Sequence, residues 1–250
     1  MIVWGNFFAH VGRVKRACNL LNLADTGITI VSLETPLIGR EHFEQCDRIE
    51  PFLRVGFWNT STLHRGGFNI PAEATDDRLN AVLRETGTEY TRTRNFGDAV
   101  LYCLQTSGDT SLQGTDVETA AIYDLVHLQR VTDRHVIVVK HPYDTKGISD
   151  LTTFCSMRSI AIVDGPLTDW IHRGFCTVSH SSSAAIDGIL HGVPAVTLNA
   201  GSFARPCSVH SIADLESATL DGCHEWLCRV VFSQWKESEF EDALKHLKIR

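Results

Sequence analysis

The chain has 250 residues, of which 43% are hydrophobic and 21% charged, and its formal net charge is −7 at neutral pH. This is the composition of a folded globular protein, and the length suits one large α/β domain or two small ones. No stretch of eighteen or more apolar residues occurs, which excludes a membrane-spanning helix. The amino terminus runs into a strand pattern rather than a signal peptide, so we expect a cytoplasmic protein (in the host cytoplasm if phage-encoded).

The first part of the chain reads as strands and helices in turn. Residues 2–4 form a short apolar run, and residues 10–23 have apolar side chains at helical spacing. A β-branched run over residues 28–33 predicts a strand, residues 54–69 predict a loop that carries glycines and a tryptophan, and residues 76–85 predict a helix.

A second series of elements begins at residue 99. Its expected helices cover residues 115–130, with a Thr115/Glu118 capping box, and residues 181–190. Terminal helical structure is expected over residues 225–247. Apolar runs predict strands over residues 99–104, 135–139, 159–163, 175–178 and 195–198.

Strands that alternate with helices indicate parallel, doubly wound sheets. Because two such series follow each other, the sequence predicts an α/β protein with two Rossmann-like lobes facing a cleft. We place the first lobe at residues 1–97 and the second at residues 98–225. Residues 226–250 are expected to form a helical segment that packs back across the lobes.

Eight cysteines are scattered through the chain, and none forms a Cys-x-x-Cys pair. Most stand inside apolar runs, which is typical of buried free thiols in a reducing compartment. A zinc site would need paired ligands at short spacing. We therefore expect no metal.

The strongest candidate for a binding site is the serine-rich segment after the expected strand 175–178. Ser181, Ser182 and Ser183 stand at the start of a helix, where hydroxyls satisfy exposed N–H groups and small residues let a phosphate approach the backbone. Asp187, further along that helix, would reach a sugar or ribose hydroxyl, or lie in solvent. A purely structural role for the serines is equally consistent with the pattern.

Two further segments follow strands of the same lobe, where ligands of open α/β sheets collect. His141 would donate to a diphosphate oxygen and Lys140 would offset its charge, although a single histidine at a strand end is more often structural. In the segment 105–111, Gln105, Gly108, Asp109 and Ser111 suit a loop that wraps a phosphate, or a plain turn. The P-loop and dinucleotide-binding glycine motifs are both absent.

In the first lobe, Glu34 follows the expected strand 28–33. A carboxylate at a strand end facing a cleft suits the general base for a hydroxyl acceptor, and a simple ion pair with Arg40 fits as well. A serine hydrolase is a poor alternative, because the Gly-x-Ser-x-Gly turn is missing.

The motifs resemble a known group of enzymes. Lys140-His-Pro142 followed by the segment 181–196 resembles the donor lobe of GT-B glycosyltransferases. It is similar to the capsule-polysaccharide (Kdo-transferase-like) group, and more distantly to UDP-N-acetylglucosamine 2-epimerases. Segments 34–40, 54–60 and 63–69, with the tail 225–247, resemble short phage-encoded proteins of this fold.

This resemblance implies a GT-B-like fold and transfer of a sugar from a nucleotide-sugar co-substrate, with a UDP-sugar as the expected donor and no bound cofactor. Glu34 and His141 would be catalytic. The implied acceptor is a 5-hydroxymethylpyrimidine in double-stranded phage DNA, although the acidic charge suits DNA poorly. Residues for acceptor contact are Arg40, Arg54, Asn59 and Arg65.

Three alternatives stay open. A capsule or lipopolysaccharide glycosyltransferase would use the same donor site with a glycan acceptor. A UDP-sugar 2-epimerase would need no acceptor. A non-catalytic pair of lobes would bind nucleotide or DNA without turnover.

Overall fold

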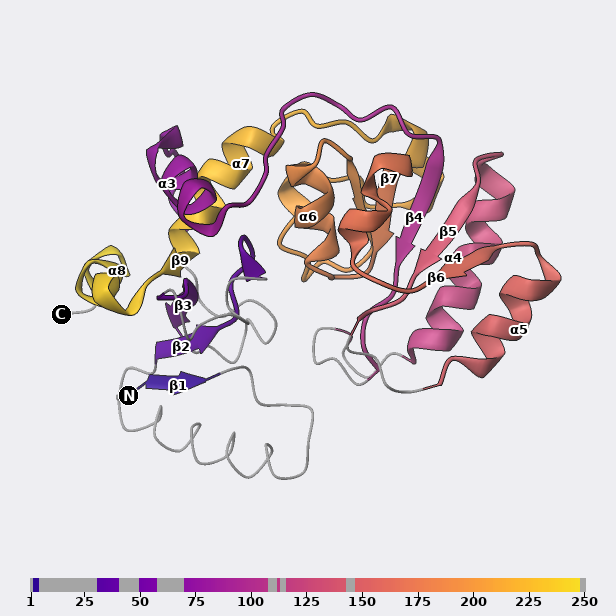
Figure 1. The fold of residues 1–250 in the computed structure, drawn as a ribbon, viewed down its shortest axis with the longest axis horizontal. Coiled ribbons are helices and arrows are strands. Elements are labelled where there is room, and N and C mark those ends of the chain that lie inside the picture. Colours follow the sequence, from indigo (N-terminus) through magenta and orange to yellow (C-terminus); the bar gives the residue numbers. More distant parts are fainter. Residues whose placement is uncertain are drawn as a thin grey trace. The chain divides into compact units, whose positions relative to one another are not determined.

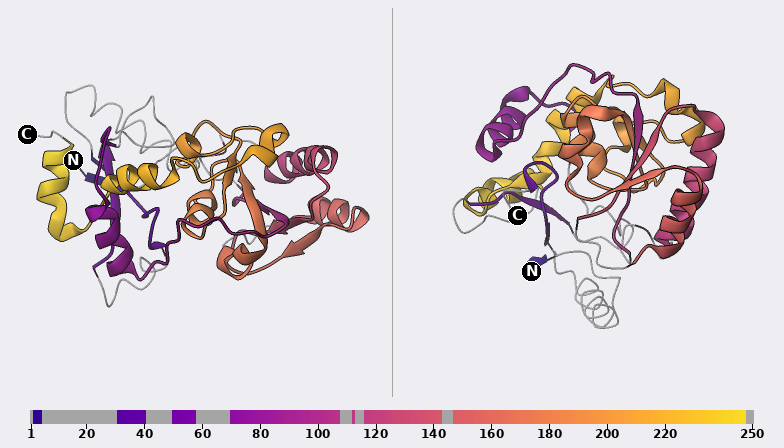
Figure 2. Two further views of the ribbon diagram at one scale, coloured as in Figure 1. Left: turned by 90° about the horizontal axis from the view of Figure 1, so that it is seen from above. Right: turned by 45° about the vertical axis from the view of Figure 1, so that its right-hand side comes forward.

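The computed structural model describes residues 2–4, 31–40, 50–57, 70–107, 112, 116–142 and 147–247. The chain forms two compact units, shown in Figures 1 and 2. Unit 1 comprises residues 1–88 and 225–250, and unit 2 comprises residues 89–224. The sequence places the two boundaries at residues 97/98 and 225/226. In the structure the segment after residue 224 belongs to unit 1.

Unit 1 contains a four-stranded sheet among its described residues, in the order β1-β2-β3-β9. β1 and β2 pair in parallel, whereas β3 is antiparallel to both β2 and β9. The predicted all-parallel lobe is therefore wrong for this sheet, because an alternation of elements does not fix the direction of each strand. Its strands are β1 (Ile2–Trp4), β2 (Val31–Glu34), β3 (Leu53–Phe57) and β9 (Gln234–Trp235).

Strand β3 also corrects the predicted loop, which began at residue 54. The hydrophobic residues Leu53, Val55 and Phe57 alternate with Arg54 and Gly56, which is the period-2 pattern of a strand. Val55 is accordingly buried. The glycine suggested a loop, but the pairing of β3 with β2 determined the conformation.

The tail of the chain completes unit 1. Trp235, Ala243 and Leu247 join Val31 and Val55 in one buried hydrophobic cluster. The tail is not uniformly helical as predicted, because β9 interrupts it. Among the described residues, the α-helices of this part are α3 (Asp76–Thr86), α7 (Cys223–Val230) and α8 (Phe240–His246).

Gln234 fixes the segment after β2 from inside unit 1. Its fully buried side chain accepts hydrogen bonds from the N–H groups of Leu37 and Ile38, both at 2.8 Å, and donates to the Ile38 carbonyl at 3.1 Å. One amide thus satisfies three buried backbone groups, which holds the chain just beyond Glu34 in place.

Unit 2 contains the five-stranded parallel sheet that the sequence predicts, in the order β6-β5-β4-β7-β8. The chain runs outward from β4 through β5 to β6, then returns and runs outward from β7 to β8 on the other side; Figure 1 labels β7, β4, β5 and β6. This is a Rossmann-like arrangement. The strands are β4 (Ala99–Cys103), β5 (Val136–Val139), β6 (Ala161–Val163), β7 (Gly174–Ser179) and β8 (Ala195–Thr197).

Strand β4 lies at the centre of this sheet, and all five of its residues are buried. Val100 and Tyr102 join one hydrophobic cluster, while Ala99, Leu101 and Cys103 join another. Both faces of the strand are therefore covered, which explains why its sequence is continuously apolar. The α-helices of unit 2 are α4 (Val117–Val131), α5 (Ser149–Met157) and α6 (Ala184–Leu190).

The start of α4 differs from its predicted capping box. The cap is Asp116, whose carboxylate accepts a hydrogen bond from the Thr119 N–H at 2.9 Å. Glu118 instead accepts from the N–H groups of Asp150 and Leu151, both at 3.0 Å, in the first turn of α5. The capping prediction is wrong because a side chain of α4 satisfies another helix.

Short 3-10 helices connect several of these elements. They are η3 (Leu167–Asp169), η4 (Ile171–Arg173), η5 (Arg205–Cys207), η6 (Ile212–Ser217), η7 (Val231–Ser233) and η8 (Glu237–Glu239). Within the described part of the chain, no helix has the length and apolar character needed to cross a membrane.

The cysteines of the described residues are free and buried, which confirms the predicted buried thiols. Burial raises the pKa of Cys155 to about 11 and that of Cys176 to about 12. Such thiols stay protonated and unreactive at neutral pH. Cys18 and Cys46 lie outside the described residues.

Two glycines let helix α6 pack closely within unit 2. A Cβ on Gly188 would meet the Thr177 side chain at 2.8 Å, so this glycine brings α6 against β7. Gly192 has a φ of +77°, and a Cβ there would lie 2.2 Å from the Thr93 carbonyl oxygen. The glycines of the segment 184–194 thus serve packing.

We therefore expect Gly192→Ala to destabilise the protein by about 2 kcal/mol or more, because left-handed strain of about 1–2 kcal/mol adds to a backbone clash. Gly222→Ala is the matched control, since Gly222 has a φ of +72° but open space around its Cβ position. Urea unfolding of both variants separates strain from clash. Equal destabilisation would show that the contact with Thr93 does not matter.

Candidate functional site

The candidate site lies at the carboxyl edge of the parallel sheet, where the strand order reverses between β4 and β7. These two strands are direct neighbours, with Tyr102 paired to Val178. Open α/β sheets bind ligands at such a reversal, because the connecting chains diverge from it and leave a crevice. The segments predicted to bind a donor follow β4, β5 and β7, which are consecutive in the sheet order β5-β4-β7.

Gln105 and Ser181 connect the ends of β4 and β7. The Gln105 side chain is buried, and its Oε1 accepts a hydrogen bond from the Ser181 N–H at 2.8 Å. Its Nε2 donates to the Ser181 hydroxyl at 3.2 Å. The structure thus brings together two of the predicted donor-binding residues, and it gives Gln105 a defined role in fixing the first turn after β7.

The other serines begin the turn into α6. The Ser182 hydroxyl accepts from the Ala184 N–H at 3.2 Å, whereas the cap residue Ser183 makes no side-chain capping bond. The helix begins at Ala184, later than the predicted start at Ser181. Asp187 is half-buried within α6, and its carbonyl accepts from the His191 N–H at 3.2 Å.

Lys140 and His141 follow β5 at the same edge. The Lys140 N–H donates to the Val163 carbonyl at 3.0 Å, which extends the ladder between β5 and β6. Its ammonium pairs with Asp164 at 2.7 Å, and the Asp164 side chain is 80% exposed. Exposed pairs of this kind contribute only about 0–1 kcal/mol, so the ammonium can exchange this partner for a ligand anion at little cost. His141 is half-buried.

A hydrogen-bonded group of three residues, Tyr102, Asp124 and His180, lies beside this edge and was not predicted from the sequence. His180 directly follows β7, and its Nε2 lies 2.8 Å from Asp124 Oδ2. The Tyr102 hydroxyl donates to the same oxygen at 2.7 Å. His180 stands within a segment already singled out, but nothing local indicates that Asp124, in the middle of α4, is its partner.

Five predicted residues lie outside the described part of the chain, so their predicted roles stay predictions. These are Gly108, Asp109 and Ser111 for the donor, and Asn59 and Arg65 for the acceptor.

The remaining predicted residues belong to unit 1. Glu34 and Arg54 are cross-strand neighbours on β2 and β3, and their side chains form an ion pair at 2.6 Å. Arg54 is buried, and burial lowers its pKa from the usual value. As placed, its guanidinium contacts Glu34 and the Thr35 carbonyl rather than presenting its charge to solvent. Arg40 is half-buried.

Two arginines near the start of unit 2, Arg92 and Arg94, also contact other groups of the chain. Arg94 donates to the Ala218 carbonyl at 2.8 Å and stacks over Phe175. Arg92 lies 2.8 Å from His224 Nε2. Because guanidinium groups only donate, His224 Nε2 is the acceptor, and its Nδ1–H points to the Tyr90 hydroxyl at 2.9 Å.

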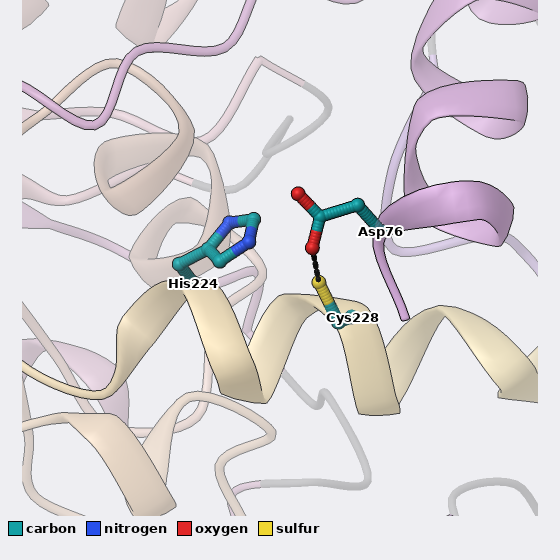
Figure 3. Close-up of side chains that lie close together, drawn as sticks. All are labelled: Asp76, His224 and Cys228. Atoms are coloured by element: carbon teal, nitrogen blue, oxygen red, sulfur yellow. Dashed lines mark hydrogen bonds between the residues drawn. The ribbon is translucent and has the colours of Figure 1, made fainter. Parts of the chain in front are cut away.

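Figure 3 shows three side chains of types that bind metals, Asp76, His224 and Cys228. His224 and Cys228 are one turn apart on α7, and the Cys228 thiol donates to Asp76 Oδ1 at 3.5 Å. Both ring nitrogens of His224 already have partners within unit 2. A metal would have to displace these hydrogen bonds and an arginine, so we assign none to this group.

Two cavities lie at opposite edges of the sheet in unit 2. A wide, open one of about 590 Å³ stands at the amino edge, where charged groups such as Arg134 and Glu216 line it. The other, at the carboxyl edge, measures about 10 Å³ and is lined in part by Gln105 and His180, with room for about one water molecule. We place the site at the carboxyl edge despite the difference in volume, because strand topology directs ligands there.

Among known proteins, the chain is distantly similar to solved structures. No protein-family model matches the chain, and no curated protein matches it. Among solved structures, the chain is similar to KpsC of Thermosulfurimonas dismutans, a β-Kdo 2,7-transferase. The two share 14% sequence identity with a TM-score of 0.44, over 96% of this chain and 91% of that one.

From the hydrogen bonds between Gln105 and Ser181, which join the ends of β4 and β7, we predict an effect on stability. We expect Gln105→Ala to destabilise the protein by about 1–3 kcal/mol, since it leaves the Ser181 N–H without its partner. The measurement is urea unfolding, with Gln129→Ala as control because Gln129 is exposed on α4. If both variants unfold at the same urea concentration, the link is unimportant for stability.

Proposed function

We propose that the protein is a glycosyltransferase whose unit 2 binds a nucleotide-sugar donor. One observation carries this proposal: the segments after β4, β5 and β7 stand together at the point where the strand order reverses, and Gln105 bonds Ser181 across it. The resemblance of the 140–142 and 181–196 segments to donor lobes supports the same function.

In the proposed reaction, the bond between the anomeric carbon and the phosphate oxygen breaks, and its electron pair stays on the departing nucleotide. The acceptor hydroxyl oxygen forms the new bond to that carbon and loses its proton to a base. Negative charge therefore develops on the leaving phosphate. Lys140 and His141 are the residues proposed to stabilise it, because groups fixed where charge develops usually give the largest catalytic effect.

Glu34 stays the proposed base, on its place at the end of β2. Its carboxylate accepts a hydrogen bond from Arg54, which would orient it. Glu34→Gln is expected to reduce transfer by at least about a hundredfold, in the range that removal of a general base costs, with donor affinity unchanged. The rate of sugar transfer tests the first expectation, and titration with the donor tests the second. Unchanged transfer would remove Glu34 from the mechanism.

His141→Ala is expected to lower turnover by about a hundredfold or more, because losing one group that stabilises developing charge costs about 2.7–4 kcal/mol. His127→Ala is the matched control, since His127 is exposed on α4. Sugar transfer is measured for both variants. A fully active His141→Ala protein would contradict the assignment.

The acceptor that we propose is the hydroxymethyl group of a modified pyrimidine in DNA, which protrudes into the major groove. It rests on the resemblance of segments 34–40, 54–60 and 63–69 alone. Hydroxymethylated duplex incubated with UDP-sugars should gain the mass of one sugar, whereas unmodified duplex should not. Transfer to a glycan instead would identify a capsule-type enzyme, and conversion of the UDP-sugar without any acceptor would identify an epimerase.

A further inference from the structure

We propose that His180, held by Asp124, is a second imidazole that binds the phosphate groups of the donor, with Asp124 and Tyr102 as its positioning residues. This inference rests on the proposed nucleotide-sugar function. It concerns only unit 2, where all three residues lie.

The first step is the position of His180. It is the first residue after β7, and the next residue, Ser181, is bound by Gln105 from the end of β4. His180 therefore stands at the reversal of strand order, within the segment where an open α/β sheet receives its ligand.

The second step is the orientation of the ring. An ionised carboxylate only accepts hydrogen bonds, so the contact of 2.8 Å with Asp124 Oδ2 places a hydrogen on His180 Nε2. Tyr102 donates to the same oxygen and is a constant donor, because burial, followed by the charge of Asp124, raises its pKa well above the usual value. Two hydrogen bonds converge on one carboxylate oxygen, which fixes it relative to the sheet.

The third step is the state of the other ring nitrogen. Among the described residues, none forms a hydrogen bond with His180 Nδ1, and the side chain is 25% exposed. Nδ1 is the ring nitrogen nearer the backbone, so it stays beside the end of β7. When the ring is protonated, Asp124 offsets its charge and Nδ1–H becomes a donor suited to an anionic oxygen.

The arrangement indicates a phosphate rather than a sugar hydroxyl as the partner. An imidazole that carries hydrogens on both ring nitrogens is a charged donor, and a charged donor discriminates in favour of an anion. The nucleoside part of the donor would gain nothing from this group. The inference therefore predicts a specific difference between nucleotide and nucleoside binding.

The test uses the full chain and isothermal titration calorimetry. Wild-type protein is titrated with UDP, GDP, ADP and CMP, and the tightest of these is compared with its own nucleoside. In His180→Gln, the amide can still donate to Asp124 but offers no group at the Nδ1 position. We expect its affinity for the nucleotide to fall at least about tenfold, as for a lost charge-assisted hydrogen bond, with nucleoside affinity unchanged.

Two further variants make the result decisive. In Asp124→Asn, the amide oxygen can accept from both His180 and Tyr102, but the charge is gone, so nucleotide affinity should fall while nucleoside affinity holds. This variant carries the test if His180→Gln fails to unfold cooperatively. Glu216→Gln removes a carboxylate that pairs with Arg134 at the amino edge, and it should bind both ligands like the wild type.

Each outcome then decides between the two proposals. Undiminished nucleotide binding by His180→Gln, or an equal loss for nucleotide and nucleoside, would overturn the role of His180 and leave the donor site standing. Wild-type protein that binds none of the four nucleotides would overturn the proposed function, and this inference with it.

Discussion

The parallel pairing of β4 with β7 is the constraint on which the rest of unit 2 depends. Both faces of β4 are buried, and both of its edges are paired, so its position in the sheet is fixed from four sides. Because the strand order reverses here, the chain leaves β4 and β7 toward opposite ends of the sheet. The polar residues just beyond these strand ends are therefore held close to each other, and they are Gln105, His180 and Ser181.

Helix α4 gives this edge a second support. Asp124 receives Tyr102 from β4 and His180 from the end of β7, while Glu118, on the same helix, satisfies the first turn of α5. Each contact pairs a carboxylate with hydrogen-bond donors of neighbouring elements. Asp124 and Gln105 together fix the turn after β7 through His180 and Ser181, and donors held in place beforehand stabilise charge most effectively.

The serine-rich segment after β7, residues 180–194, serves two different purposes along its length. Its first part, at residues 180–183, carries the polar groups of the edge. Its second part, from Ala184 to Pro194, is mostly buried, and Gly188 and Gly192 allow close contact with Thr177 and Thr93. In unit 1, Glu34 and Arg54 likewise combine two roles. They are predicted to act on the acceptor, and they also form a cross-strand ion pair.

The sequence by itself determined the five strands of unit 2, helices α4 and α6, and the strand ends that carry its polar groups, because apolar periodicity and chain order are local properties; it did not predict helix α5. It did not reveal that β3 is an antiparallel strand, that Glu118 satisfies another helix, or that Asp124 meets His180. Those features depend on strand direction and on contacts between residues 32 to 76 positions apart, such as Glu118 with Asp150 and Gln105 with Ser181. Only the folded chain decides such contacts, because packing brings together polar groups that stand far apart in the sequence.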